Sequence, residues 1–112
     1  MRPKRPGWIA LDFDNTLWDT AKQLPMPGAQ DALEAFRSRG IRVMIHSCNR
    51  PAFIRKMCEE HQLIVDAIWG EDTADHGQKP FADLYIDDSG LRFSGDWANT
   101  TSIALELLGY GG

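Results

Sequence analysis

The sequence has few cysteines and no long apolar run. Its two cysteines, Cys48 and Cys58, form no CxxC pair and lack zinc-ligand spacing, so we expect neither a disulfide framework nor a structural zinc site. No stretch approaches the roughly 18 apolar residues that a membrane-spanning helix needs. Proline and glycine stand near the N-terminus where a signal peptide would be apolar. We therefore expect no membrane partner and a cytoplasmic location.

An excess of positive charge is also missing. The net charge is −4, whereas a surface that binds nucleic acid is usually basic, so nucleic acid is disfavoured as a partner. The exception is residues 1–6, where Arg2, Lys4 and Arg5 stand among prolines. This stretch is either a flexible, solubilising tail or an arm that attracts phosphate. With 112 residues and an ordinary apolar content, the chain is expected to form one domain, residues 1–112.

Short apolar runs alternate with helical patterns along the chain. Strands are expected at residues 8–13, 41–46, 63–69 and 83–86, and helices at 28–39, from Pro51, and after the capping residue Asp96. In the last helix, the buried face is expected to carry Ile103, Ala104, Leu107 and Leu108. This alternation predicts an α/β fold, a Rossmann-like three-layer sandwich with a mostly parallel sheet covered on both faces.

Polar clusters follow three of the expected strands, at residues 12–16, 47–50 and 87–88. Ligands of parallel sheets bind beyond the carboxyl ends of the strands, so these clusters should meet at one edge. Asp12 and Asp14 point the same way if the strand period continues, and they repel each other unless a cation or a proton lies between them. Mg²⁺ is the natural cation for such a carboxylate pair, although the two residues alone could also be a solvated strand end.

Each of the other polar residues also has two interpretations. Asp87 and Asp88 are a second pair that is costly to assemble without a metal, or a polar turn. Ser47 lies between a strand and a helix, where it either binds an anion or caps the helix. Lys79 could offset phosphate charge near the carboxylates, or it could be an ordinary exposed lysine.

Taken in order, these stretches resemble the four motifs of the haloacid dehalogenase superfamily. DFDNTL at residues 12–17 is similar to the first motif, MIHS at 44–47 to the second, Lys79 to the third, and YIDD at 85–88 to the fourth. The resemblance runs from Trp8 to the last expected helix. It is closest to small phosphohydrolases of the magnesium-dependent phosphatase type that carry no cap domain.

The resemblance implies catalytic roles for four residues. Asp12 would be the nucleophile that forms an aspartyl-phosphate, and Asp14 the acid for the leaving oxygen and then the base for water. Ser47 would bind the phosphoryl oxygens and Lys79 would offset their charge. An acid at the position of Asp14 is typical of the phosphatases of this superfamily and is lacking in its dehalogenases.

The resemblance also implies a metal site and a wider substrate site. Mg²⁺ would bind Asp12, the backbone carbonyl of Asp14, and the Asp87–Asp88 pair, of which Asp88 is favoured as the direct ligand. Substrate would also contact Cys48 and Asn49 beside Ser47, and Asn49 has the alternative of capping the next helix.

The sequence departs from the family pattern at two motif positions and has no room for a cap. Asn15 stands where glycine is common and tolerates the left-handed conformation, and Ser47 replaces the commoner threonine but keeps the hydroxyl. A site without a cap is open to water. It suits a phosphorylated small molecule or the exposed phosphate of a larger one, unless a neighbouring subunit in a homo-oligomer closes it.

Two rival functions fit parts of this pattern. A receiver domain of a signalling pathway also uses Asp, Ser or Thr, and Lys, but its acidic pair comes first and its lysine last. An inactive scaffold or binding protein could keep the fold, although the complete motif set argues against it. The identity of the substrate cannot be read from these residues.

Overall fold

The computed structural model describes residues 7–71, 82–87 and 91–109, so the predicted tail at residues 1–6 lies outside it. Six strands and three helices are found in the described residues. In chain order they are β1 (Trp8–Leu11), β2 (Trp18–Asp19), β3 (Leu24–Pro25), α1 (Ala29–Arg37), β4 (Arg42–Ile45), α2 (Pro51–Glu60), β5 (Ala67–Ile68), β6 (Leu84–Ile86) and α3 (Trp97–Leu107).

Four of the strands form one sheet in the order β5-β4-β1-β6. Every described pair in it is parallel, and Leu11 at the end of β1 stands beside Ile45 of β4 and Ile86 of β6. The predicted α/β fold with a mostly parallel sheet is therefore confirmed. β1 and β4 end earlier than predicted, where the chain enters its polar cluster, whereas β5 is confined to Ala67–Ile68 and β6 begins one residue later than predicted. At that edge the amides of Asp12 and His46 make the last bonds, to Ile86 O and Leu11 O.

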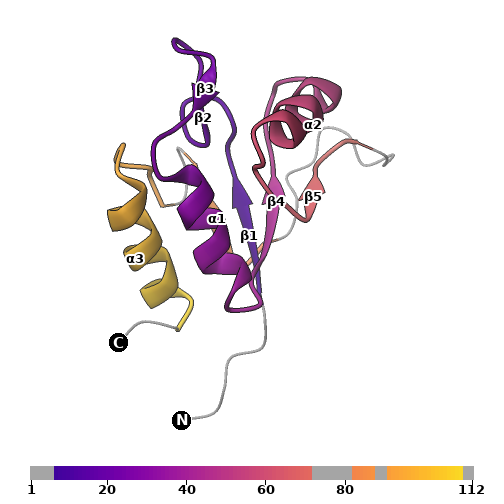
Figure 1. The fold of residues 1–112 in the computed structure, drawn as a ribbon. Helices are drawn as coiled ribbons and strands as arrows, with labels where there is room; N and C mark the ends of the chain where they lie inside the picture. The colour runs from indigo at the N-terminus through magenta and orange to yellow at the C-terminus, as the bar shows by residue number, and fades with distance from the viewer. Residues whose placement is uncertain (1–6, 72–81, 88–90, 110–112) are drawn as a thin grey trace.

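The two faces of the sheet differ. Ile9, Leu11 and Ile45 share one face and are buried in a core cluster that includes residues of all three helices. On the other face, Trp8 is half-buried and the Arg42 guanidinium lies 5.5 Å from its ring centroid. The helices α1 and α3 lie side by side, with α2 over β4 and β5 (Figure 1). In the described part of the chain, helices cover only the first of these faces.

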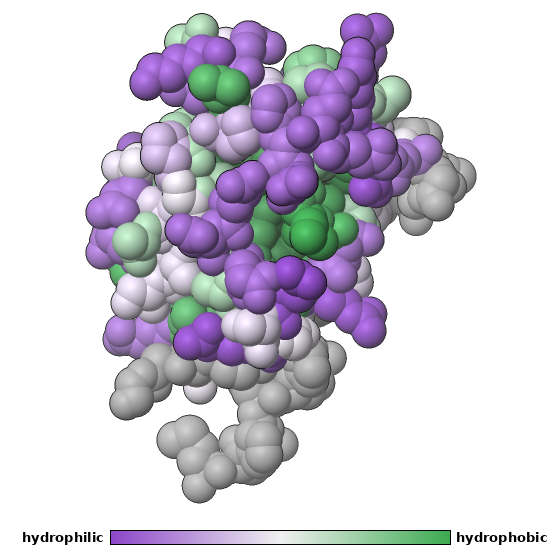
Figure 2. All heavy atoms as spheres, in the orientation of Figure 1, coloured by the Kyte–Doolittle hydropathy of each residue, from purple (hydrophilic) through white to green (hydrophobic). Residues whose placement is uncertain are grey.

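The amino end of α2 lies near the polar clusters, and its other end borders an apolar hollow. This hollow, of about 670 Å³, lies between α1, α2 and the segment before β5, and its walls include Leu63, Ile64 and Val65. Figure 2 shows an apolar area on the face seen in Figure 1, and hydrophilic surface surrounds it. None of the described helices is long and apolar enough to cross a membrane.

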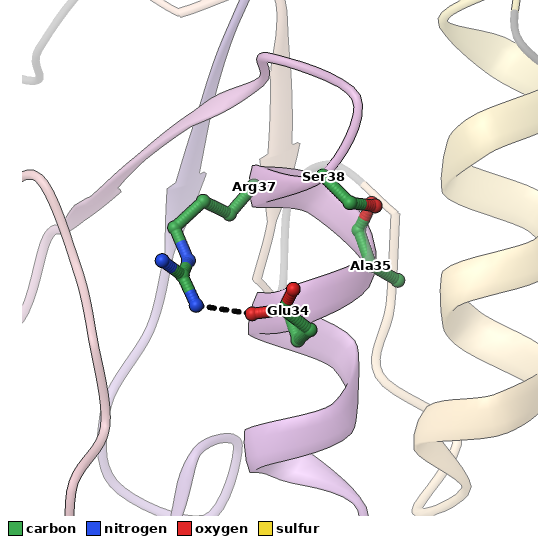
Figure 3. A network of polar contacts seen from close by, with 4 residues as sticks. All are labelled: Glu34, Ala35, Arg37 and Ser38. Carbon is green, nitrogen blue, oxygen red and sulfur yellow. Dashed lines mark hydrogen bonds and ion pairs between the residues drawn. The ribbon is translucent and has the colours of Figure 1, made fainter.

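Local polar contacts stabilise the carboxyl end of α1 (Figure 3). Arg37 pairs with Glu34 one turn earlier, and the Ser38 hydroxyl donates to the Ala35 carbonyl over 3.0 Å. Both partners of the ion pair are largely exposed, so it adds little stability. Gly40 then adopts a φ of 76° in the turn that leads into β4.

The predicted loop or flap at residues 15–26 contains the antiparallel hairpin of β2 and β3. The first residue of the hairpin, Trp18, is 1% exposed and lies in the core. The Trp18 ring stacks on Phe13 at 5.6 Å and contacts the edge of His61 at 5.1 Å. The hairpin is thereby attached to the body of the domain directly after the DFDNT stretch.

The predicted buried face of α3 is partly wrong. Ile103 is 38% exposed and Leu107 is 61% exposed, whereas Ala104 and Leu108 are buried as expected. The buried stripe instead begins at Trp97 and continues at helical spacing through Thr100, Ala104, Leu105 and Leu108. The large side chain of Trp97 at the first turn sets the rotation of the helix, and the apolar residues at its end follow that rotation.

The start of α3 is tied to the first polar cluster. Asp96 caps the helix as predicted, because its carboxylate accepts hydrogen bonds from the amides of Ala98 and Asn99 over 3.0 and 3.3 Å. The indole N–H of the buried Trp97 donates to the Thr16 carbonyl over 2.8 Å. The last helix therefore holds the loop that carries Asp12 and Asp14.

We expect Trp97→Phe to lower the free energy of unfolding by about 1–3 kcal/mol, because it leaves the buried Thr16 carbonyl without its donor. Urea denaturation measures this change. Trp18→Phe is the matched control, since Trp18 is 1% exposed like Trp97 and its indole N–H has no hydrogen-bond partner among the described residues. Equal stability losses in the two variants would contradict a role for the Trp97 hydrogen bond.

Candidate active site at the carboxyl edge of the sheet

A pocket of about 260 Å³ opens at the carboxyl ends of β1 and β6. Its walls combine three carboxylates, three polar or cationic residues and one aromatic ring. They are Asp12, Asp14, Asn15, Thr16, Asp87, Arg92 and Phe93. Asp12, Asp14 and Asp87 were predicted to meet here, and the parallel pairing of β1 with β6 brings them to one place.

The loop after β1 is organised around one carbonyl oxygen. The amides of Thr16, Leu17 and Trp18 all donate to the Phe13 carbonyl, over 3.1, 3.1 and 3.0 Å. Phe13 itself is fully buried, so the centre of this turn is anchored in the core. Asp12 and Asp14 flank it and face the pocket.

Asn15 makes the tight turn possible. It adopts a left-handed φ of 59°, the conformation expected for this position. Its side-chain oxygen accepts from the Thr20 hydroxyl over 2.8 Å, which joins the turn to the hairpin. The departure from glycine at this position is therefore compatible with the left-handed turn, as expected from the tolerance of asparagine for that conformation.

The cluster after β4 reaches Asp14 through Asn49. The Asn49 side-chain amide donates to both carboxylate oxygens of Asp14 over 3.3 Å. The Asn49 side-chain oxygen accepts from the Arg50 amide over 2.8 Å, and its backbone amide donates to the Ser47 hydroxyl over 3.0 Å. This pattern fixes the orientation of the amide, because a flipped side chain would place its oxygen against the carboxylate.

Two residues of the predicted site, Lys79 and Asp88, lie outside the described residues. Asp87 is described, and the chain around it returns to the sheet. The Asp87 amide donates to the Leu91 carbonyl over 3.2 Å, and the Leu91 amide donates to the Tyr85 carbonyl over 2.7 Å. These two hydrogen bonds hold Asp87, the first residue of the acidic pair, beside Leu91 at the pocket.

The donor chemistry of the pocket suits a hard divalent cation. Asp12, Asp14 and Asp87 all offer carboxylate oxygens, the ligand type that Mg²⁺ prefers. No cluster of three or more His, Cys, Asp or Glu side chains within the described ranges is arranged closely enough to hold a metal ion. The three carboxylates therefore share the pocket without forming a complete coordination shell of side chains.

Arg92 and Phe93 line the pocket and were missed by the sequence analysis. They belong to no motif, and their only signal was their place just after the acidic pair, where the chain leaves the same sheet edge. The Phe93 ring lies 4.8 Å from the Trp97 ring, measured between centroids. The residues after β6 thus form one wall of the site.

Neither cysteine lines the carboxylate pocket. Both cysteines are free, which agrees with the expected absence of a disulfide. Burial raises the pKa of Cys58 to about 11, so its thiolate is scarce at neutral pH. Cys48 is exposed and follows Ser47, and its predicted contact with substrate stays a prediction.

Comparisons with known proteins agree with this geometry. The family model described as haloacid dehalogenase-like hydrolase matches residues 9–103. A solved structure of a conserved protein from Bacteroides thetaiotaomicron is similar in fold, with a TM-score of 0.68 and 21% identity, over 91% of this chain and 92% of that chain. A search of curated proteins found no match. Because the family model spans most of the sequence, the chain belongs to the haloacid dehalogenase-like hydrolases.

Proposed function

We propose that this protein is a Mg²⁺-dependent phosphohydrolase that cleaves phosphomonoesters through an aspartyl-phosphate on Asp12. The observation that carries this proposal is that Asp12, Asp14 and Asp87 line one pocket, in a chain of the haloacid dehalogenase-like hydrolase family. Asp12 and Asp14 flank the buried Phe13, so both carboxylates extend from a rigid turn.

In the first half-reaction, a carboxylate oxygen of Asp12 attacks phosphorus while the bond from phosphorus to the leaving oxygen breaks. Asp14 gives its proton to that oxygen, so the leaving group departs as an alcohol. In the second half-reaction, Asp14 takes a proton from water, and the resulting hydroxide attacks phosphorus. Inorganic phosphate is released and the Asp12 carboxylate is restored.

The position of Asp14 depends on Asn49. Two hydrogen bonds from one amide hold both oxygens of the carboxylate, and the same amide is oriented by the Arg50 backbone. A general acid must lie within hydrogen-bond reach of the atom that receives its proton. We therefore assign Asn49 as a positioning residue for Asp14, in addition to its predicted place near the phosphate.

In this proposal, three sets of groups stabilise the negative charge of the phosphoryl group. Ser47 and the amides beside it bind phosphoryl oxygens, and Lys79 offsets their negative charge. Mg²⁺ would be held by Asp12, the backbone carbonyl of Asp14, and the Asp87–Asp88 pair. A bound magnesium ion supplies charge neutralisation for the attacking carboxylate and the phosphoryl oxygens.

The open site suits both a phosphorylated small molecule and a phosphate on a larger molecule. The hairpin β2–β3 is the only insertion between β1 and α1, and it packs on the core through Trp18. No cap domain is found in the described residues. We propose as substrate a phosphorylated small molecule or an exposed phosphate on a larger one, and a homo-oligomer remains compatible with the open edge.

We expect Asp12→Asn to reduce kcat on p-nitrophenyl phosphate with Mg²⁺ by at least about 10³-fold, because the amide cannot form the acyl phosphate. The melting temperature should stay near that of the wild type. Asp31→Asn, an exposed change in the first turn of α1, is the control and should keep full activity. Substantial turnover by Asp12→Asn would exclude Asp12 as the nucleophile.

A wild-type protein with no metal-dependent turnover from about pH 5 to 8 would instead favour an inactive binding protein.

We expect Asn49→Ala to lower kcat/KM, which reports the first half-reaction, about tenfold on an alkyl phosphate and much less on p-nitrophenyl phosphate. An alkoxide is a poor leaving group that needs the proton of Asp14, whereas p-nitrophenolate leaves without it. Steady-state kinetics on both esters separate this effect from a general loss of folding. Asn99→Ala on the exposed side of α3 is the matched control. An equal loss on both esters would contradict the positioning role of Asn49.

A further inference from the structure

We infer that Arg92 binds a second anionic group on the substrate, so the site prefers phosphomonoesters whose leaving group carries a carboxylate or another phosphate. This inference rests on the proposed function. It extends that function from the phosphoryl group, which is common to all candidate substrates, to the part of the molecule that distinguishes them.

The backbone holds Arg92 at a set place on the pocket wall. On one side, the Leu91 amide and carbonyl are hydrogen-bonded to Tyr85 and Asp87 over 2.7 and 3.2 Å. On the other side, Phe93 packs against Trp97. Because both of its neighbours are anchored, the Arg92 side chain extends from a position that is fixed relative to the catalytic carboxylates.

The charge of Arg92 is available for a ligand. The side chain is exposed, and it forms no ion pair or hydrogen bond with any described residue, although three carboxylates line the same pocket. A guanidinium presents a planar fork of N–H donors that matches carboxylate and phosphate oxygens. An unpaired guanidinium beside a phosphoryl site therefore fits an anion better than a neutral group.

Phe93 limits what lies between the two anions. It is half-buried, lines the pocket and borders Arg92 along the chain. The Phe93 ring contacts Trp97, whose indole is hydrogen-bonded to Thr16 in the nucleophile loop. Trp97 thus supports Phe93 from within the core, and Phe93 gives the pocket wall beside Arg92 an apolar part. A short carbon chain or ring could pack on it while its terminal anion reaches Arg92.

The test compares two esters of equal length, a short alkyl phosphate ending in a carboxylate and the same alkyl phosphate ending in a carboxamide. We expect the wild type to have a kcat/KM about fivefold higher on the carboxylate ester, as an exposed ion pair allows. Arg92→Gln should remove this preference through a raised KM, and Arg92→Lys should keep part of it. The preference should weaken as salt is added.

Arg39→Gln is the control, because Arg39 is exposed just before β4, at the opposite edge of the sheet. If Arg92→Gln slows both esters equally, Arg92 acts on the transferred phosphoryl group and the inference is overturned. If the wild type shows no preference between the esters, the inference is overturned as well.

Binding of the two corresponding phosphonates, which cannot be hydrolysed, separates this inference from the proposed function. Calorimetry in the presence of Mg²⁺ should give tighter binding of the carboxylate form to the wild type and not to Arg92→Gln. That result without any turnover would overturn the phosphohydrolase proposal and keep the anion site. Turnover with equal binding of the two phosphonates would overturn the anion site and keep the phosphohydrolase proposal.

Discussion

The pairing of β1 with strands on both of its sides is the constraint on which the site depends. β1 lies between β4 and β6, and all three strands run parallel, so their carboxyl ends arrive at one edge. This arrangement brings Asp12, Asp14 and Asp87 to one pocket and Asn49 within hydrogen-bond distance of Asp14. At this edge the amides of Asp12 and His46 still bond to the neighbouring strands, and the residues around them lie where ligands of parallel sheets bind.

The negative charge of three carboxylates in one pocket has to be balanced by other groups of the site. Three carboxylates around one pocket repel each other, and such a group is stabilised by a cation, by hydrogen-bond donors or by a proton. Asp14 receives two hydrogen bonds from Asn49. Arg92 adds a positive charge at the same pocket without pairing to any described carboxylate. The pocket therefore combines an acidic centre suited to a metal with a cationic rim suited to an anion.

The loop at residues 12–16 is held by contacts from distant parts of the chain. Its turn is built on the Phe13 carbonyl, and Trp97, far along the chain, donates to Thr16 at the end of the turn. Trp18 adds a stacked contact with Phe13 from the hairpin. In the proposed function this loop carries the nucleophile and must hold its geometry without substrate, and the last helix and the first hairpin both contact it.

Much of this could be predicted from the residues alone. Apolar runs and helical periods located the main elements, and the polar clusters at strand ends indicated where Asp12, Asp14 and Asp87 would gather. Asp96 was identified as a cap because its position before a helical pattern has a local physical reason. These predictions succeed because backbone period and capping depend on residues near in sequence.

The exposed faces of α3, the partner of Asn49 and the place of Arg92 were decided by tertiary structure. Ile103 and Leu107 have the same local pattern as buried residues, but the packing of Trp97 rotates them outward. Capping was the more economical interpretation of Asn49 from its sequence, and only the packing of two loops gives it Asp14 as a partner. The sequence by itself determined which elements form and which chemistry stands at their ends. Contacts between distant residues depend on how helices and loops pack, and no local pattern encodes that packing.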